Sequence, residues 1–268
     1  MSGYYVRSAI LVGSIPLMAE WGRDAVVLAQ GLGIDPIALR DPDIPVPAAL
    51  VLSFYERAAG QTGCRSFGLR MATRTGISVV GPLWVLLRQA QTIEQMLDDL
   101  VAHFDLYTQA AVTRLSHEGS ARRLSWSTTT GVAEREVQMA EFSVAVLCAE
   151  IRRHAPAGWE PVAVRFRHSA PPDRSELRRV LGSNLSFDQA DNSILLERAL
   201  LDRPLRVEGS RTRELLSHVL RQSGEPVDPG LIERVDGVVR ALMPYASCTL
   251  ADLGRARGMA PRTLQEHL

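Results

Sequence analysis

Apolar residues recur every three or four positions along much of the first half of the chain. This spacing lines up apolar side chains on one face of a helix, and it predicts an amphipathic helix wherever it persists. The segments with this pattern are 15–30, 50–59, 83–87, 93–107, 134–153, 174–181 and 211–220. Segment 83–87 has no polar face, so we expect it to be buried. Segment 35–47 carries several prolines and is expected to be a connector without helix.

Alternating apolar and polar residues replace the helical pattern in the middle of the chain. Segments 111–115 and 124–127 are predicted to form a β-hairpin, with Val112, Leu124 and Trp126 facing inward. Further short strands are expected at 162–166 and within 185–196. The pattern therefore predicts an α+β fold, in which helices accompany a small antiparallel sheet.

The last twenty residues, 249–268, have the layout of two short helices joined by a turn. Thr249 is suited to cap the first helix, with Asp252 as the acidic partner of a capping arrangement. Gly258 stands where a helix ends and the chain turns sharply, and Pro261 suits the first turn of a second helix. Helix, glycine turn and helix in this order predict a helix-turn-helix.

Composition and charge limit the possible locations and partners. Thirty basic and thirty acidic residues cancel, so any affinity for nucleic acid must be local. Cys64, Cys148 and Cys248 are odd in number and far apart, which favours a reducing compartment over a disulfide framework. No stretch has the length of uninterrupted apolar residues that a membrane span or a secretory signal requires. We therefore expect a cytoplasmic protein that does not enter a membrane.

The sequence contains no arrangement that predicts catalysis. It has no G-x-S-x-G motif and no phosphate-binding loop, and its six histidines are scattered without the spacing of metal ligands. We therefore predict that the protein is not an enzyme and that it needs neither a metal nor another cofactor.

The run GMAPRTLQEHL, preceded by TLADLGRAR, resembles the first helix-turn-helix of the AraC/XylS family of bacterial transcription regulators. Three positions depart from that family. Ala260 stands where serine is usual, Gly254 where alanine is usual, and Glu266 where arginine is frequent. The family's DNA-binding domain has two helix-turn-helix units, and this sequence ends within the first. The resemblance thus implies an incomplete all-α helix-turn-helix domain, truncated either as a fragment of a longer regulator or naturally.

The upstream sequence is similar to the arabinose-binding and dimerisation type of N-terminal domain that a branch of this family carries. The likeness lies in FGLRM at Phe67, in segments 81–87, 92–107 and 134–153, in VAVRFRH from Val162 and in LSFDQ from Leu185 leading to Leu200 and Pro204. It implies an effector-binding and dimerisation domain at 1–222, that is, an α+β sensor domain. A proline-containing linker at 223–230 and a partial DNA-binding domain at 231–268 are expected to follow.

By position, several C-terminal residues match those with which the family reads DNA. The resemblance implies that the recognition helix contacts base edges of double-stranded DNA through Arg262, Thr263, Gln265 and Glu266, while Arg255 and Arg257 contact phosphates. The alternative interpretation is a truncated sensor and dimerisation module without autonomous DNA binding, which acts through mixed dimers.

An effector pocket needs apolar walls and a few polar groups. The candidate wall residues are Trp84, Phe104, Tyr107, Trp126 and Phe166, and the candidates for fixing an anionic group on an unknown small molecule are Arg70 and Arg74. The alternative is that the aromatic residues are ordinary core and the arginines ordinary surface.

Segment 134–153 also carries the pattern of a coiled-coil seam, which suggests a homodimer. The seam residues are Val137, Ala140, Val144, Leu147 and Ile151. Phe142, Val146 and Ala149 widen this apolar surface, so packing in the core of a single chain is the alternative.

Overall fold

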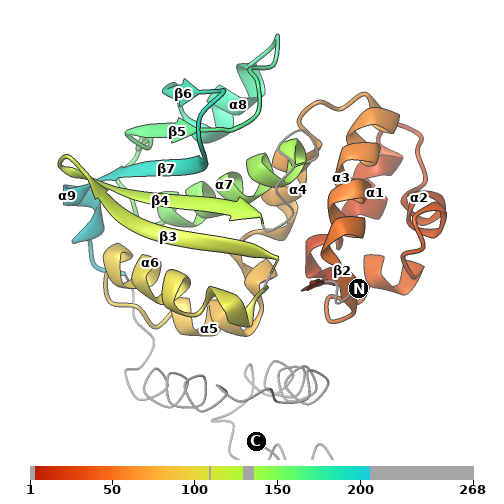
Figure 1. The fold of residues 1–268 in the computed structure, drawn as a ribbon, viewed down its shortest axis with the longest axis horizontal. Helices are drawn as coiled ribbons and strands as arrows, with labels where there is room; N and C mark the ends of the chain where they lie inside the picture. The colour runs from red at the N-terminus through yellow and green to blue at the C-terminus, as the bar shows by residue number, and fades with distance from the viewer. Residues whose placement is uncertain (1–3, 109, 129–135, 206–268) are drawn as a thin grey trace, which may run out of the picture. The chain divides into compact units, whose positions relative to one another are not determined.

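The computed structural model describes residues 4–108, 110–128 and 136–205 (Figure 1). The chain divides into two compact units, Met1–Gly209 and Ser210–Leu268. The helix predicted at 211–220, the linker at 223–230 and the helix-turn-helix lie outside the described residues. Their boundaries therefore stay predictions.

The described part consists of a helical N-terminal region followed by a mixed α and β region (Figure 1). The α-helices are α1 (Ser14–Ala19), α2 (Ala25–Gly31), α3 (Ala48–Thr62), α4 (Phe67–Thr75), α5 (Pro82–Leu87), α6 (Ile93–Ala102), α7 (Val137–Arg152), α8 (Ser175–Leu181) and α9 (Arg198–Leu201). Short 3-10 helices are η1 (Ser8–Ile10), η2 (Pro36–Leu39), η3 (Ile77–Val80) and η4 (Phe104–Leu106). The strands are β1 (Tyr5–Arg7), β2 (Pro45–Pro47), β3 (Ala111–Glu118), β4 (Ala121–Thr128), β5 (Ala163–Arg165), β6 (Leu185–Ser186) and β7 (Asn192–Glu197).

The main sheet is five-stranded, in the order β3-β4-β7-β5-β6, and α7 lies against it (Figure 1). The α+β prediction is confirmed for this region, but the sheet is mixed rather than purely antiparallel, because β5 and β6 run parallel. Helix α8 connects these two strands. A parallel pair needs a crossover connection of this kind, since a tight hairpin joins only antiparallel strands.

The helical pattern at 15–30 predicts one continuous helix, and this prediction is wrong. The segment forms α1 and α2, separated by Gly22 in the left-handed conformation at φ 64°. The Asp24 side chain then starts α2 by accepting a hydrogen bond from the Val26 N–H at 2.7 Å. The connector at 35–47 is also more ordered than expected, because it contains η2 and β2. Pro36 suits the first turn of η2, where no N–H is needed.

The hairpin is confirmed, but one predicted inward residue is wrong. β3 and β4 pair with Thr113 opposite Trp126 and Leu115 opposite Leu124. Side chains alternate between the two faces of a strand, so Val112 lies on the face opposite to Trp126 and Leu124. Its side chain is 43% exposed. The register therefore places Thr113, and not Val112, on the inward face.

Helix α7 packs closely against α4. A Cβ atom on Gly68 would lie 2.0 Å from the backbone oxygen of Gln138, so only glycine permits this approach. The Gln138 side chain also accepts a hydrogen bond from the Gly68 N–H at 2.8 Å. This contact fixes the position of α7, which most of the described core surrounds.

Within residues 4–108, 110–128 and 136–205, no helix is long and apolar enough to cross a membrane. The same residues contain no group of three or more histidine, cysteine, aspartate or glutamate side chains placed to hold a metal ion. Cys64 and Cys148 are buried free thiols.

Candidate functional site

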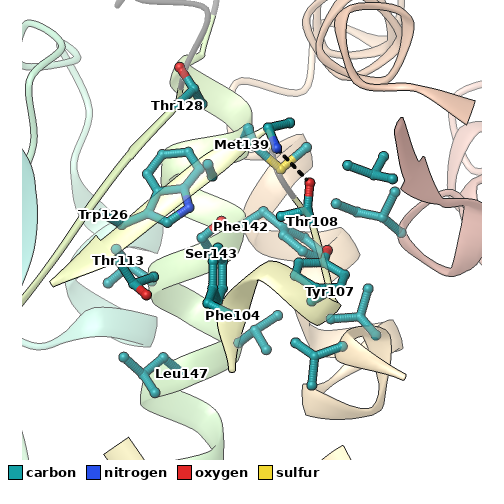
Figure 2. Close-up of a pocket in the computed structure, with 18 of the residues that line it drawn as sticks. Phe104, Tyr107, Thr108, Thr113, Trp126, Thr128, Met139, Phe142, Ser143 and Leu147 are labelled. Atoms are coloured by element: carbon teal, nitrogen blue, oxygen red, sulfur yellow. Dashed lines mark hydrogen bonds between the residues drawn. The ribbon is translucent and has the colours of Figure 1, made fainter. Parts of the chain in front are cut away.

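A cavity of about 120 Å³ lies where the N-terminal helical region meets the sheet and α7 (Figure 2). Its walls come from β1, η1, α3, η3, the end of α6, η4, the β3–β4 hairpin, α7 and β7. Segments far apart in the sequence thus enclose a single site.

Aromatic and aliphatic side chains form most of the cavity lining. Phe104 and Tyr107 make an edge-to-face contact, with ring centroids 5.7 Å apart. The Trp126 side chain reaches the cavity from β4, and Phe142 and Leu147 reach it from α7 (Figure 2). None of the described lining residues carries a charge. The cavity therefore suits a molecule that is largely apolar.

Hydroxyl groups supply most of the polarity of the lining. Thr108 accepts a hydrogen bond from the Ala110 N–H at 3.0 Å, drawn in Figure 2, and Thr128 donates one to Glu136. The Thr113 hydroxyl is buried and, within the described part of the chain, has no hydrogen-bond partner. Burying such a group without a partner costs about 1 to 3 kcal/mol. The Thr113 hydroxyl is thus the polar group in the lining that a bound molecule would be expected to hydrogen-bond.

Tyr107 contributes an uncharged phenol to the same lining. Burial raises its pKa to about 12, although the positive charge of Arg7 opposes part of this shift. The phenol therefore keeps its proton at neutral pH and is able to donate or accept a hydrogen bond.

Three of the predicted wall residues, Phe104, Tyr107 and Trp126, are brought together in this cavity, which the prediction did not locate. Trp84 and Phe166 do not line it. The Arg88 guanidinium lies 4.7 Å from the centre of the Trp84 ring, and Phe166 stacks on Phe187 with centroids 5.8 Å apart.

The two predicted anion-binding arginines also lie away from the cavity lining. Arg70 pairs with Glu176 at 2.6 Å and its guanidinium lies 5.3 Å from the Trp21 ring. Arg74 pairs with Glu20. Each arginine already has a carboxylate partner, so neither is placed to bind an anion in this cavity.

Residues 22–205 match the family described as the arabinose-binding domain of AraC transcription regulators, N-terminal. The chain belongs to this family of AraC-type regulators. It is 26% identical to the HTH-type transcriptional regulator VirS of Mycobacterium tuberculosis, in strains CDC 1551 / Oshkosh and ATCC 25618 / H37Rv alike. The alignment covers 99% of this chain and 79% of VirS. The protein is thus a transcription regulator.

The AraC-type regulator also shares its fold with a solved structure. The crystal structure of the transcriptional regulator CdpR from Pseudomonas aeruginosa superposes with a TM-score of 0.52 at 15% identity. The match covers 91% of this chain and 76% of CdpR. At this identity the similarity concerns the fold alone.

The residues predicted to form a dimer seam in this regulator belong mostly to its own core. Ala140, Val144, Leu147 and Ile151 are buried within the described chain, and Val137 is half-buried. Val144 and Leu147 also line the cavity. This burial agrees with the alternative of core packing, and dimerisation through these side chains stays an untested prediction.

A buried charged cluster lies on the side of α7 that does not line the cavity. The wholly buried Glu141 carboxylate accepts two hydrogen bonds from Arg65, at 3.0 and 2.7 Å. Burial raises the pKa of Glu141, and Arg65 acts against this shift. The ring of His168 lies 3.5 Å from the same carboxylate, and burial lowers the pKa of that histidine. We call Arg65, Glu141 and His168 the charged cluster.

Sequence reasoning missed Thr113, Phe142 and Ser143 as cavity residues. The hairpin register would have identified Thr113, since it faces the same side as Trp126. The predicted DNA-contacting residues lie outside the described residues, so the structure places none of them.

Proposed function

We propose that this regulator binds a small-molecule effector in the cavity and controls transcription by sequence-specific DNA binding. The observation that carries the proposal is a largely apolar cavity, with the buried and, within the described residues, unpaired Thr113 hydroxyl, lined mostly by residues of the matched N-terminal domain. Occupancy would favour one arrangement of the regulator over another, because a ligand shifts an equilibrium toward the state that binds it better.

The DNA-binding part of the proposal rests on the C-terminal helix-turn-helix motif. Arg262, Thr263, Gln265 and Glu266 would read base edges, and Arg255 and Arg257 would hold phosphates. The proposal includes a homodimer in the cytoplasm, which would place two reading helices on neighbouring half-sites. It includes no catalytic step.

A mobility-shift titration tests DNA binding directly. The protein expressed from its complete gene is titrated against the DNA upstream of that gene, in parallel with Arg262→Ala and Arg198→Ala. Loss of one base contact of about 1 to 3 kcal/mol should weaken DNA binding by Arg262→Ala by about fivefold to about 150-fold. Arg198, an exposed arginine of the N-terminal unit, is the control and should bind as the unaltered protein does. Equal binding by all three proteins would reject the assigned recognition helix.

The second candidate is a sensor module without autonomous DNA binding. Two residues favour this sensor module. Ala260 stands in place of a serine that would cap the recognition helix. Glu266 stands in place of an arginine, and its carboxylate would be repelled by DNA phosphates. This candidate predicts no mobility shift with the protein alone and formation of mixed dimers with a related regulator. Detection of the shift described above would exclude it.

A further inference from the structure

The chemistry of the cavity lining restricts the kind of molecule that it can take. We infer that the ligand is a small uncharged molecule, mostly apolar, with one hydroxyl or carbonyl oxygen, and that it is neither a sugar nor an anion. This inference rests on the proposed effector-binding function and deepens it.

The volume limits the size of the ligand. A cavity of about 150 Å³ lined by apolar side chains is known to hold benzene, and the cavity here measures about 120 Å³. The cavity is partly open to solvent, so a single ring or a short alkyl chain is the size that fills its measured volume.

The charges near the cavity argue against an anionic ligand. None of the described lining residues is charged, and an ionised group buried without a partner pays a large desolvation penalty. Arg7, whose positive charge acts on the buried Tyr107, is paired with the Asp43 carboxylate, and at the wall the Glu136 carboxylate accepts a hydrogen bond from Thr128. Arg70 and Arg74, the predicted anion partners, are paired elsewhere with Glu176 and Glu20.

The small number of polar groups argues against a sugar. A sugar carries a hydroxyl on nearly every carbon, and each one buried without a partner weakens binding by about tenfold. The described lining offers few polar side chains that could pair with them, namely Thr113, Ser143, Tyr107 and Trp126, because the hydroxyls of Thr108 and Thr128 already form hydrogen bonds within the protein. One or two ligand oxygens match this set better than four or five.

Thr113 is the best candidate for the polar contact. Its hydroxyl is buried without a partner in the described chain, and Trp126 is its cross-strand neighbour on the same face. The Trp126 ring supplies an N–H donor and Thr113 supplies both a donor and an acceptor. Figure 2 shows both residues, with Ser143 of α7, among the side chains around the cavity. A single ligand oxygen near Thr113 would satisfy the buried hydroxyl.

Thermal unfolding of the full chain with four matched probes tests the inference. Benzyl alcohol and toluene are uncharged, whereas benzoate carries a charge on a similar ring, and L-arabinose carries several hydroxyls. We expect benzyl alcohol and toluene to raise the unfolding temperature in a concentration-dependent way, and benzoate and L-arabinose to leave it unchanged. A greater rise with benzoate or L-arabinose, or no rise with any probe, would overturn the inference.

Two variants establish where the probes bind. Thr113→Val removes the hydroxyl and nearly keeps the shape of the side chain. It should weaken the binding of benzyl alcohol about tenfold, and toluene should bind as tightly as before or more tightly. Ser143→Leu places a larger side chain in the cavity and should weaken both probes. Circular dichroism confirms that each variant is folded. Unchanged binding of both probes by both variants would show that they bind elsewhere, which also overturns the inference.

The outcome is separable from that of the proposed DNA binding. If no probe binds but Arg262→Ala still weakens DNA binding, the inferred ligand class is wrong and the proposed DNA binding is supported. If the probes bind in the cavity and Arg262→Ala binds DNA normally, the ligand class stands and the assigned recognition helix fails.

Discussion

Helix α7 separates two interior regions with opposite polar character. On one side lies the cavity, whose described lining residues are uncharged and include Thr113, whose hydroxyl has no hydrogen-bond partner among the residues that the structure describes. On the other side lies the charged cluster, in which the buried Glu141 carboxylate accepts hydrogen bonds from both terminal nitrogens of Arg65. Glu141 is wholly buried while the Arg65 side chain is 38% exposed, and in the described chain each region contains one buried polar atom without a hydrogen-bond partner, the Thr113 hydroxyl at the cavity and Nε2 of His168 in the charged cluster.

The difference shows how a structural polar group is distinguished from one that suits a ligand. Next to the charged cluster, the Gln138 side chain accepts a hydrogen bond from Gly68 and donates one to the Arg65 carbonyl at 2.9 Å. Those bonds join α4 to α7, and they are complete without a ligand. Around the cavity, the Thr113 hydroxyl joins nothing in the described chain. Other buried polar atoms of the described chain also lack a partner, but Thr113 is the residue among them that lines the cavity, so its hydroxyl is the group there that suits a ligand.

The apolar side of α7 should depend on packing alone. Phe142 is buried and makes an edge-to-face contact with Tyr55 at 5.6 Å. Phe142→Ala removes this contact and enlarges the cavity, so we expect the free energy of unfolding to fall by about 4 kcal/mol. Urea unfolding should give the same loss at pH 5 and at pH 7, because burial raises the pKa values of the neighbouring Tyr55 and Tyr107 far above this range. A loss that differs between the two pH values would contradict the contrast between the two sides.

The charged side should depend on pH. Arg65→Met leaves the buried Glu141 carboxylate without its main partner, and we expect a loss of about 3 kcal/mol at pH 7. Burial raises the pKa of Glu141 above its ordinary value of 4.5, and removal of Arg65 takes away an interaction that lowers it. The folded-state pKa therefore rises further. The carboxyl is then protonated more readily in the folded state, so the loss shrinks as the pH falls toward 4.5.

The free energy of unfolding of the variant is compared with that of the unaltered protein at each pH. This comparison is needed because His168, a second titratable group, lies 3.5 Å from Glu141. The double variant Arg65→Met, Glu141→Gln is the matched control. It lacks the Glu141 carboxylate, so its loss should change less between pH 5 and pH 7 than that of Arg65→Met; Glu56, whose pKa Arg65 also lowers, remains in both variants. A loss for Arg65→Met that grows as the pH falls would reject the assigned direction.

Much of the fold follows from local sequence patterns. The helical spacing predicted α3, α7 and α8, and the apolar segment at 83–87 was correctly expected to be buried at Leu83, Leu86 and Leu87. The patterns failed where a single residue determines whether a helix continues. At Gly22, the left-handed backbone divides one predicted helix into two. Periodicity does not reveal such a break, because the apolar spacing continues across it.

The candidate site was predictable only in part. Of the five aromatic residues predicted as walls, Phe104, Tyr107 and Trp126 line the cavity, whereas Trp84 and Phe166 do not, because residue type alone does not say which face a side chain occupies. The pairing of Arg70 with Glu176 was not predictable, since the two residues are 106 positions apart in the sequence. Long-range contacts of this kind decide whether an arginine is free to bind a ligand, and a local pattern contains no information on them.

The smallest predicted effect tests the hairpin register on which the Thr113 assignment depends. A shift of one residue in a strand moves every side chain to the opposite face. In the observed register Val112 faces outward and is 43% exposed, so Val112→Thr should change the free energy of unfolding by no more than about 0.5 kcal/mol. Leu124 is 5% exposed, and Leu124→Thr is the matched control, with an expected loss of about 2 kcal/mol or more. If Val112→Thr proved as costly as the control, Val112 would face the core, Thr113 would face solvent, and the cavity would lose its polar contact.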